Sequence, residues 1–348
     1  MEFIAEYGMF LAKTVTAVVA LLIIIGAIAA ISARHKTAAK EHVEVKHLNQ
    51  KFEGMAHLLE SATMHKKELK HREKERKKQA KAEEKAEKKQ LSSDPESHKK
   101  RIYVLDFDGD IRGSEVASLR EEITAILTVA TPKDEVLLKL ESTGGLVHAY
   151  GLAASQLQRI KDKKVPLTAA VDKVAASGGY MMACVADKII AAPFSIIGSI
   201  GVLTQIPNFH RLLKKHDIDF EQVTAGEFKR TVTVFGETTE KAREKLKEEV
   251  EETHVLFKDF IKQQRPALEV ERVATGEHWL GSRALELGLV DELRTSDDYM
   301  LASSEEADIY EVTFTTKQTV IEKLAALMSM TLRSRQNPLT ATDRTPII

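Results

Sequence analysis

The stretch that decides the fold of this chain reads LTAAVDKVAASGGYM and covers residues 167–181. Its first five residues are apolar, small or β-branched, as in a buried strand, and the GGYM at its end begins an apolar helical stretch. The small residues beside Ser177 allow a sharp turn between the two. Backbone N–H groups at the start of a helix can hold an oxyanion, so Ser177 is a candidate nucleophile. A plain helix N-cap in a tight turn is the alternative interpretation.

Short β-rich runs and helical stretches alternate around this turn. We expect strands at residues 102–105, 136–140, 167–171 and 188–192, and helices at about residues 114–129, 146–162 and 178–186. This alternation predicts an α/β domain with a mainly parallel sheet. Residues 189–206 carry no charge, but Pro193 and the glycines after it favour a buried strand followed by a functional loop over a membrane span.

A second glycine pair also lies between a predicted strand and a predicted helix. It occurs in the sequence LESTGGL at residues 140–146. The N–H group of Gly145 could therefore complete an oxyanion site that begins at Gly178.

A serine nucleophile needs a base. Seven of the twelve histidines precede residue 101, and the other five stand in no recognisable catalytic context: His148, His210, His216, His254 and His278. A lysine can take the place of histidine once burial in an apolar pocket lowers its pKa from about 10.4 toward neutrality. Lys229, in the sequence TAGEFKRT at residues 224–231, is a candidate, although the residues alone do not separate it from a surface lysine.

Charge divides the 348 residues into three parts. Lys and Arg total 51 against 52 Asp and Glu, but residues 1–33 have a net charge of −1, residues 34–101 of +8 and the remainder of −8. The single cysteine, Cys184, excludes a disulfide framework and a cysteine-based metal centre within one subunit. The chain therefore consists of an apolar segment, a basic segment and an acidic domain in series.

The apolar segment is interpreted as a membrane anchor. Residues 14–33 form a run of 20 without a charge, which is the length that a helix needs to cross the hydrocarbon layer. We place the anchor at residues 9–33, after a short segment at residues 1–8. A cleaved signal peptide is the alternative, but the run is long and the residues before it are acidic. Positive charges after the run place the rest of the chain in the cytoplasm by the positive-inside rule.

The basic segment is predicted to be a charged stalk over residues 34–100. Its Lys, Glu, Ala, Arg and Gln residues favour a helix with almost no apolar stripe. A basic surface for anionic lipid or nucleic acid is the alternative, but interspersed acidic residues and a lack of aromatic residues favour a solvated spacer. A globular domain follows at residues 101–310, and a C-terminal helix near residues 324–332 and a loose tail complete the chain at residues 311–348.

Five motifs in this order resemble the signal peptide peptidase family of membrane-bound serine proteases, SppA and SohB. They are STGG at 142–145, ASGGY at 176–180, GSIGV at 198–202, GEFK at 226–229 and WLG at 279–281. The sequence departs from the family where Thr143 replaces a more usual proline and where Arg230-Thr231 follows the lysine.

This resemblance implies a ClpP/crotonase-like spiral of ββα units and a serine endopeptidase with a Ser/Lys dyad. Ser177 would be the nucleophile and Lys229 the general base and acid. Gly178 and Gly145 would form the oxyanion hole, and Ser199 would hold the lysine. No metal and no cofactor are implied.

The resemblance also implies partners and a location. Substrates would be peptides such as signal peptide remnants or misfolded exported polypeptides, and no nucleic acid partner is expected. The chain would contact membrane lipid through its N-terminal helix and form a homo-oligomeric ring, in which the serine and the lysine of one site come from the same or from adjacent subunits. The location would be the bacterial inner membrane with a single span. We favour a periplasmic domain, in conflict with the flanking positive charges.

Two other functions fit parts of the sequence. YVLDFDGD at residues 103–110 imitates the nucleophile motif of haloacid dehalogenase phosphatases, with Asp106 as the nucleophile. That motif has threonine where this chain has Asp110, and a loop rich in Asp and Gly at a strand end is the favoured explanation. The second alternative is a membrane-anchored assembly platform of the same fold that has lost catalysis, against which the presence of Ser177 and Lys229 argues.

Overall fold

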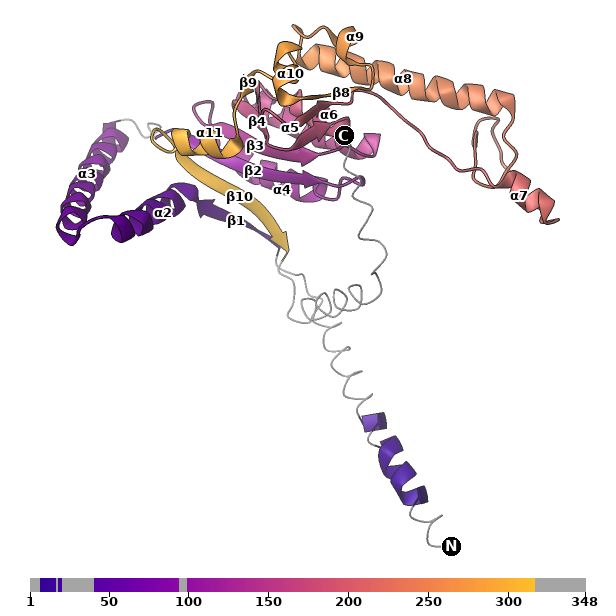
Figure 1. Cartoon of the computed structure of the whole chain (residues 1–348), viewed down its shortest axis with the longest axis horizontal. Coiled ribbons are helices and arrows are strands. Elements are labelled where there is room, and N and C mark those ends of the chain that lie inside the picture. Colours follow the sequence, from indigo (N-terminus) through magenta and orange to yellow (C-terminus); the bar gives the residue numbers. More distant parts are fainter. Residues whose placement is uncertain (1–6, 17, 21–40, 94–98, 317–348) are drawn as a thin grey trace. The chain divides into compact units, whose positions relative to one another are not determined.

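The computed structural model describes residues 7–16, 18–20, 41–93 and 99–316 (Figure 1). Residues 43–314 form one compact unit, and the terminal segments belong to another. Among the described residues, no helix combines the length and the apolar character needed to cross a membrane. Most of the predicted anchor at residues 9–33 lies outside the described residues, as does the predicted helix at 324–332.

The centre of the unit is a mixed β-sheet whose long strands run parallel. Its main path has the order β1 (Glu41–His47), β10 (Asp308–Thr316), β2 (Arg101–Gly109), β3 (Glu135–Ser142), β4 (Leu167–Val171), β6 (Lys188–Ala191) and β9 (Glu292–Leu293). From β10 to β9 every neighbouring pair is parallel. Three short strands extend the sheet off this path: β5 (Val174–Ala176), β7 (Ile196–Gly198) and β8 (His278–Leu280). The four strands expected from the sequence are confirmed, and β2 and β3 are longer than expected.

The two faces of the sheet bury different layers because successive strand residues point to opposite sides. Leu105 and Phe107 belong to the larger apolar core, which includes residues of α4 (Val116–Leu127), α5 (Val147–Asp162) and α6 (Gly178–Ala183). Val104, on the other face, packs in a smaller cluster with Leu48 and Met300 from α2 (Leu48–Thr63) and α11 (Ser296–Ser303). Helices therefore cover both faces, as parallel strands require.

The beginning of the predicted stalk is part of the sheet, which corrects the stalk boundaries of 34–100. Strand β1 pairs with β10, and Asn49 at the start of α2 bonds to the backbone around the start of β10. The Asn49 amide donates to the carbonyls of Ser304 and Ala307 (3.0 and 2.9 Å), and its oxygen accepts from the N–H of Ile309 (2.7 Å). The helical part of the stalk consists of α2 and α3 (Lys66–Ser93). Strand β10 likewise runs past residue 310, where we expected the domain to end.

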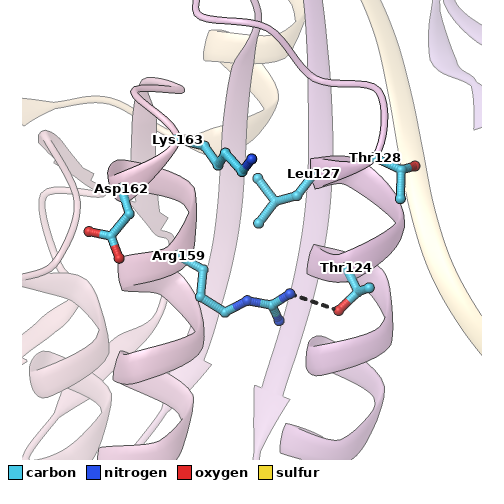
Figure 2. Close-up of a pocket in the computed structure, with 6 residues that line it drawn as sticks. All are labelled: Thr124, Leu127, Thr128, Arg159, Asp162 and Lys163. Atoms are coloured by element: carbon cyan, nitrogen blue, oxygen red, sulfur yellow. Dashed lines mark hydrogen bonds between the residues drawn. The ribbon is translucent and has the colours of Figure 1, made fainter.

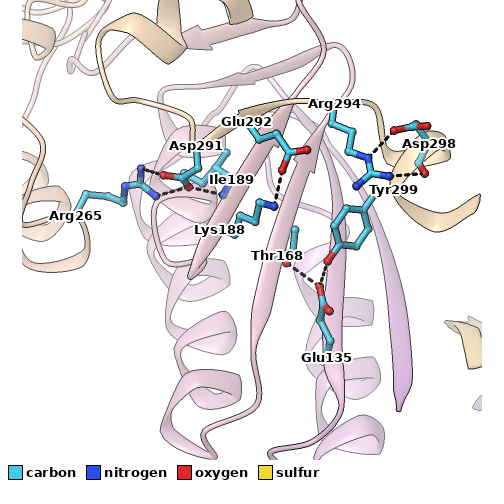
Figure 3. Close-up of polar contacts among 10 residues, drawn as sticks. All are labelled: Glu135, Thr168, Lys188, Ile189, Arg265, Asp291, Glu292, Arg294, Asp298 and Tyr299. Carbon is cyan, nitrogen blue, oxygen red and sulfur yellow. Dashed lines mark hydrogen bonds and ion pairs between the residues drawn. The ribbon is translucent and has the colours of Figure 1, made fainter. Parts of the chain in front are cut away.

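Polar contacts join the C-terminal elements to the sheet (Figure 3). Arg265 follows α8 (Glu240–Gln264) and binds both carboxylate oxygens of Asp291 (2.6 and 2.8 Å), which also accepts from the N–H of Ile189 (2.7 Å). Burial favours the neutral acid, but these hydrogen bonds hold the pKa of Asp291 below its ordinary value. The pair thus ties the end of α8 to the strand that precedes the loop at Pro193.

A buried carboxyl group predicts a pH-dependent stability. Glu122 on α4 is 5% exposed and accepts a hydrogen bond from the N–H of Phe314 (2.8 Å). Burial raises the pKa of Glu122 to about 7, against that hydrogen bond and with help from Glu115 and Asp106. The pKa of Glu122 in the folded state lies above its unfolded value of about 4.5. The contribution of protonated Glu122 to the free energy of unfolding is therefore fully present below pH 4.5 and is lost as the pH rises through 7.

We therefore expect Glu122→Gln, which keeps an acceptor for Phe314 and removes the charge, to stabilise the protein at pH 8 by about 1–3 kcal/mol. At pH 4.5 the difference should be small. Chemical denaturation at the two pH values measures this, with the exposed Glu121→Gln as the matched control. Equal effects of Glu122→Gln at both pH values would contradict the assignment.

Candidate functional site

The candidate site forms where the ends of three parallel strands meet. In the register of the sheet, Ser142 of β3 is opposite Ala175 of β5, and Ala176 of β5 is opposite Gly198 of β7. The residues that follow these strand ends therefore lie side by side at one edge. The N–H of Ser177 donates to the carbonyl of Gly198 (2.8 Å), which fixes this arrangement. The sheet thus brings together the STGG, ASGGY and GSIGV motifs.

Ser177 adopts a backbone conformation that is unfavourable for a residue with a side chain. Its φ is 51° and its ψ is −117°, immediately before α6. Such a conformation costs about 1–3 kcal/mol and persists only where the surroundings impose it. The residue is not an ordinary N-cap, because its side chain makes no capping hydrogen bond. The turn instead leaves a half-buried hydroxyl beside the first N–H groups of a helix.

The second glycine turn packs directly on the first. A Cβ atom on Gly144 would lie 2.8 Å from the Cβ of Ser177 and 2.6 Å from the nitrogen of Gly178. A Cβ on Gly145 would lie 2.1 Å from the carbonyl oxygen of Ile111, so neither position has space for a side chain. Among the described residues, the N–H of Gly145 has no acceptor. Gly144 of the second turn therefore packs directly against Ser177, and the N–H of Gly145 is available as a hydrogen-bond donor.

Tyr150 of α5 supports both turns, although it is not among the site residues that the sequence predicts. Its ring is fully buried and its hydroxyl donates to the carbonyl of Asp110 (2.7 Å) and contacts the hydroxyl of Ser142 (2.5 Å). The Ser142 hydroxyl in turn accepts from the N–H of Gly144 (3.1 Å). Burial raises the pKa of Tyr150, which keeps the hydroxyl protonated as a donor. One signal in the sequence could have indicated this role: a tyrosine on the buried face of a helix needs a polar partner for its hydroxyl.

Gly178 lies so close to Tyr150 that alanine cannot replace it without a shift. A Cβ there would be 2.5 Å from the Cγ of Tyr150. We expect Gly178→Ala to lower the free energy of unfolding by about 1–3 kcal/mol and to reduce any hydrolysis that depends on Ser177 at least tenfold. Thermal unfolding and activity assays measure the two effects.

Gly151→Ala is the matched control for this substitution. Gly151 lies inside α5 with no atom within 4 Å of the added Cβ, so alanine there should be neutral or stabilising. Wild-type stability and activity in Gly178→Ala would show that the contact with Tyr150 does not shape the turn.

Ser199 lies next to this turn. Its φ of 49° is also positive, and its N–H donates to the carbonyl of Glu277 (2.7 Å). Gly198 before it is held against the ring of Trp279, which would be 2.8 Å from a Cβ. Ser199 is half-buried, and among the described residues no hydrogen bond of its hydroxyl is present, so it is free to hold another group.

Among the described residues, no hydrogen bond joins Lys229 to Ser177. It lies in an exposed segment at residues 202–239, here called the arm, which contains α7 (His210–Lys215). Figure 1 shows the arm leaving the sheet and reaching the N-terminal end of α8. Among the described residues, no hydrogen bond or ion pair of the Lys229 ammonium is present. In the part of the chain that the structure describes, the Ser177 hydroxyl has no hydrogen bond to a basic side chain, and none of the five histidines of the domain is a partner.

The arm holds its shape by contacts with itself and with α8. The N–H of Phe209 donates to the carbonyl of Val234 (2.7 Å), and the rings of Phe220 and Phe235 are 5.9 Å apart. Lys241 of α8 pairs with Glu227. Large apolar side chains of the arm are nevertheless 41% to 98% exposed: Leu203, Phe209, Leu212, Ile218, Phe220, Val223, Phe228 and Phe235. An exposed apolar surface of this kind is typical of a protein interface.

A cavity of about 440 Å³ lies elsewhere in the domain (Figure 2). It is lined by Thr124, Leu127, Thr128, Arg159, Asp162 and Lys163. These residues stand at the C-terminal ends of α4 and α5. Since α5 follows β3 and precedes β4, its C-terminal end lies at the amino edge of the parallel strands, opposite Ser177. Arg159 closes part of the cavity by donating to the hydroxyl of Thr124 (3.1 Å).

The phosphatase-like motif does not form a site at a strand end. Asp106 lies inside β2 at an exposed position, and its carboxylate pairs with Lys139 of β3 (2.8 Å). A nucleophile of that class belongs beyond the carboxyl end of its strand. The Asp-rich sequence is therefore explained by cross-strand pairing, and by the turn in which Asp110 accepts from Ser114 (2.8 Å).

Comparison with known proteins identifies related sequences over most of the chain. The family models described as peptidase family S49 N-terminal and peptidase family S49 match residues 2–157 and 159–310. The probable protease SohB of Haemophilus influenzae is 52% identical over 325 residues, which are 92% of this chain and 92% of that protein.

A second relative and a solved structure add to this comparison. The probable protease SohB of Buchnera aphidicola subsp. Schlechtendalia chinensis is 48% identical, over 87% of this chain and 100% of that protein. A mutant of the membrane-bound stomatin-specific protease 1510-N in complex with a substrate peptide is 15% identical with a TM-score of 0.40, over 67% of this chain and 100% of that one.

Proposed function

Because the chain belongs to peptidase family S49, the family of SppA and SohB, we propose that it is a membrane-anchored serine endopeptidase with a Ser/Lys dyad. One observation carries this proposal. Ser177 is held at a strained turn between two glycine-containing loops, with its hydroxyl beside the N–H groups that start α6. A structural serine has no need of that conformation, whereas a nucleophile must be exposed next to oxyanion donors.

The proposed reaction uses four groups around Ser177. The Ser177 oxygen attacks the carbonyl carbon of the peptide while neutral Lys229 takes the hydroxyl proton. The N–H groups of Gly178 and Gly145 stabilise the negative oxygen of the tetrahedral intermediate. Lys229 then gives the proton to the leaving amine, an acyl-enzyme remains, and water hydrolyses it. Ser199 accepts a hydrogen bond from the lysine and positions it.

A second copy of the chain would complete the site. Among the described residues no basic side chain is hydrogen-bonded to Ser177, and the segment that carries Lys229 is an exposed apolar arm. Docking of the arm on a neighbouring domain would bury its apolar side chains and bring Lys229 to that neighbour's Ser177. Burial also disfavours the charged ammonium, as a base requires. Because one surface would contact a different surface of the next copy, such contacts close into a homo-oligomeric ring with the ClpP/crotonase-like arrangement expected for the family.

The anchor supports a membrane location, and the family resemblance supports the periplasmic side and the substrates. The uncharged run at residues 14–33 would hold the chain in the bacterial inner membrane by a single span, with the peptidase domain on the periplasmic side. The site would meet signal peptide remnants or misfolded exported polypeptides there. An unfolded chain suits the site, because the flanking turns offer backbone groups that pair with extended peptide.

A serine-directed fluorophosphonate tests the nucleophile and the function together. We expect the purified full-length protein to cleave an unfolded, apolar-rich polypeptide and to lose this activity when Ser177 is labelled, as located by mass spectrometry. Absence of both cleavage and labelling in folded oligomers would favour a catalytically inactive platform. Phosphatase activity that Asp106→Asn abolishes would contradict the peptidase.

A further inference from the structure

Charge is segregated around helix α3. Six lysines recur at intervals of three or four residues: Lys67, Lys70, Lys74, Lys78, Lys81 and Lys85. At 100° per residue these positions fall within about 80° of the helix circumference. None of the six glutamates of α3 falls within this arc. We call this face the lysine stripe; from Lys67 to Lys85 it extends about 27 Å along the helix.

The lysine stripe is exposed, and no ion pair of its lysines occurs among the described side chains. All six side chains are exposed, and among the described side chains none of them has a carboxylate partner. The basic residues on the other side of α3 behave differently. Arg72 and Arg76 both bind Glu60 of α2 (3.2 and 2.8 Å). Since these contacts hold the opposite side of α3 against α2, the lysine stripe points away from α2.

A row of like charges this dense works against the helix that carries it. Lysines three and four residues apart repel each other and destabilise an isolated helix. An anionic surface would remove this repulsion along the whole row. The charge pattern therefore fits a partner with many negative groups spread over about 27 Å, rather than a single anion.

We propose that the lysine stripe lies on the surface of a bilayer that contains anionic lipid. The inference rests on the proposed membrane anchor, because the apolar run ends at residue 33 and residues 34–66 connect it to Lys67, so the anchor raises the effective concentration of the stripe at the bilayer. Clustered lysines on a helix next to a membrane segment attract anionic headgroups. Nucleic acid fits less well, since α3 contains no Phe, Tyr or Trp side chain for base stacking.

Contact of the lysine stripe with lipid would set the orientation of the peptidase domain relative to the membrane. Asn49 bonds α2 to the end of the sheet, and Glu60 bonds α2 to α3. Headgroup contacts along α3 would therefore be transmitted to the domain through two hydrogen-bonded junctions. The hairpin of α2 and α3 becomes a support that lies on the bilayer, in place of the solvated spacer that the sequence favoured.

The test measures how fast individual lysines of the full-length protein react with a water-soluble acetylating reagent. The protein is reconstituted into phosphatidylcholine vesicles with or without 30% phosphatidylglycerol, and mass spectrometry follows each lysine. We expect the stripe lysines to react about fivefold more slowly with the anionic lipid, and the protection to disappear at 1 M salt. Lys247 and Lys262 of α8 are exposed reference lysines and should react equally in both vesicles.

Charge-matched variants separate the stripe from net charge. Lys74→Glu combined with Lys78→Glu should abolish the protection of Lys67, Lys70 and Lys85. Lys247→Glu combined with Lys262→Glu, with the same change of net charge, should leave it intact. Equal loss of lysine protection in both double variants would overturn the role of the stripe.

Flotation of the same samples measures membrane anchoring separately from the lipid contact of the lysine stripe. Flotation with both vesicles but equal lysine reactivity would overturn the stripe contact and leave the anchor standing. Failure to float with phosphatidylcholine vesicles would contradict the anchor and the inference with it. Stronger protection by a single-stranded oligonucleotide than by anionic vesicles would assign the stripe to nucleic acid and overturn the lipid contact.

Discussion

Ser177→Ala should lower kcat/KM for peptide hydrolysis by at least about 10³-fold while the protein stays folded. The methyl group of alanine fits the space of the serine side chain, and the turn is held by backbone hydrogen bonds to Gly198 and Met181 that the substitution leaves in place. The loss should appear in kcat, because the hydroxyl forms its new bond only in the transition state.

Ser155→Ala is the matched control. Ser155 lies on an exposed position of α5 and its hydroxyl bonds only the carbonyl of Gly151 (2.8 Å). Cleavage of an unfolded polypeptide by the two variants and the wild type, at equal circular dichroism, gives the comparison. Activity in Ser177→Ala within tenfold of the wild type would remove this serine from the reaction.

Lys229→Met should reduce hydrolysis by about 10²–10⁴-fold, the usual contribution of a general base. Lys229→Arg should be as inactive, because a guanidinium keeps its charge and cannot accept the serine proton. Since Lys229 is exposed and bonds no other side chain in the described chain, neither variant should alter the stability of the subunit.

The arginine variant distinguishes a base from a structural charge. Lys247→Met, at an exposed position of α8, controls for the loss of a surface lysine and should keep full activity. If Lys229→Arg were active, Lys229 would act through its charge, and the base would have to be sought elsewhere.

The order of strands and helices could be predicted because it depends on local patterns. The runs at 136–140 and 167–171 are apolar and bounded by turn residues, and both are strands. Strand β1 was missed, because EHVEVKH is mostly polar and its pairing with β10 makes it a strand. Two other short strands, β5 and β7, are likewise formed by pairing between distant segments.

The turn at Ser177 could be predicted, but its support could not. Glycines and small residues mark both loops, and the register of β3, β5 and β7 places them together as expected for one site. Tyr150 looks like any apolar residue on the buried face of a helix, and its contacts with Ser142 and Gly178 depend on packing. The base could not be located because the described chain brings no basic side chain to the serine.

Mixed oligomers of Ser177→Ala and Lys229→Met subunits test the composite site most directly. The two inactive variants are co-expressed with different tags, and oligomers that carry both tags are purified and assayed. In randomly mixed rings about a quarter of the sites would combine an intact serine with an intact lysine from the neighbour, so we predict about a quarter of wild-type activity. No activity in mixed oligomers whose assembly is confirmed would contradict a site shared between subunits.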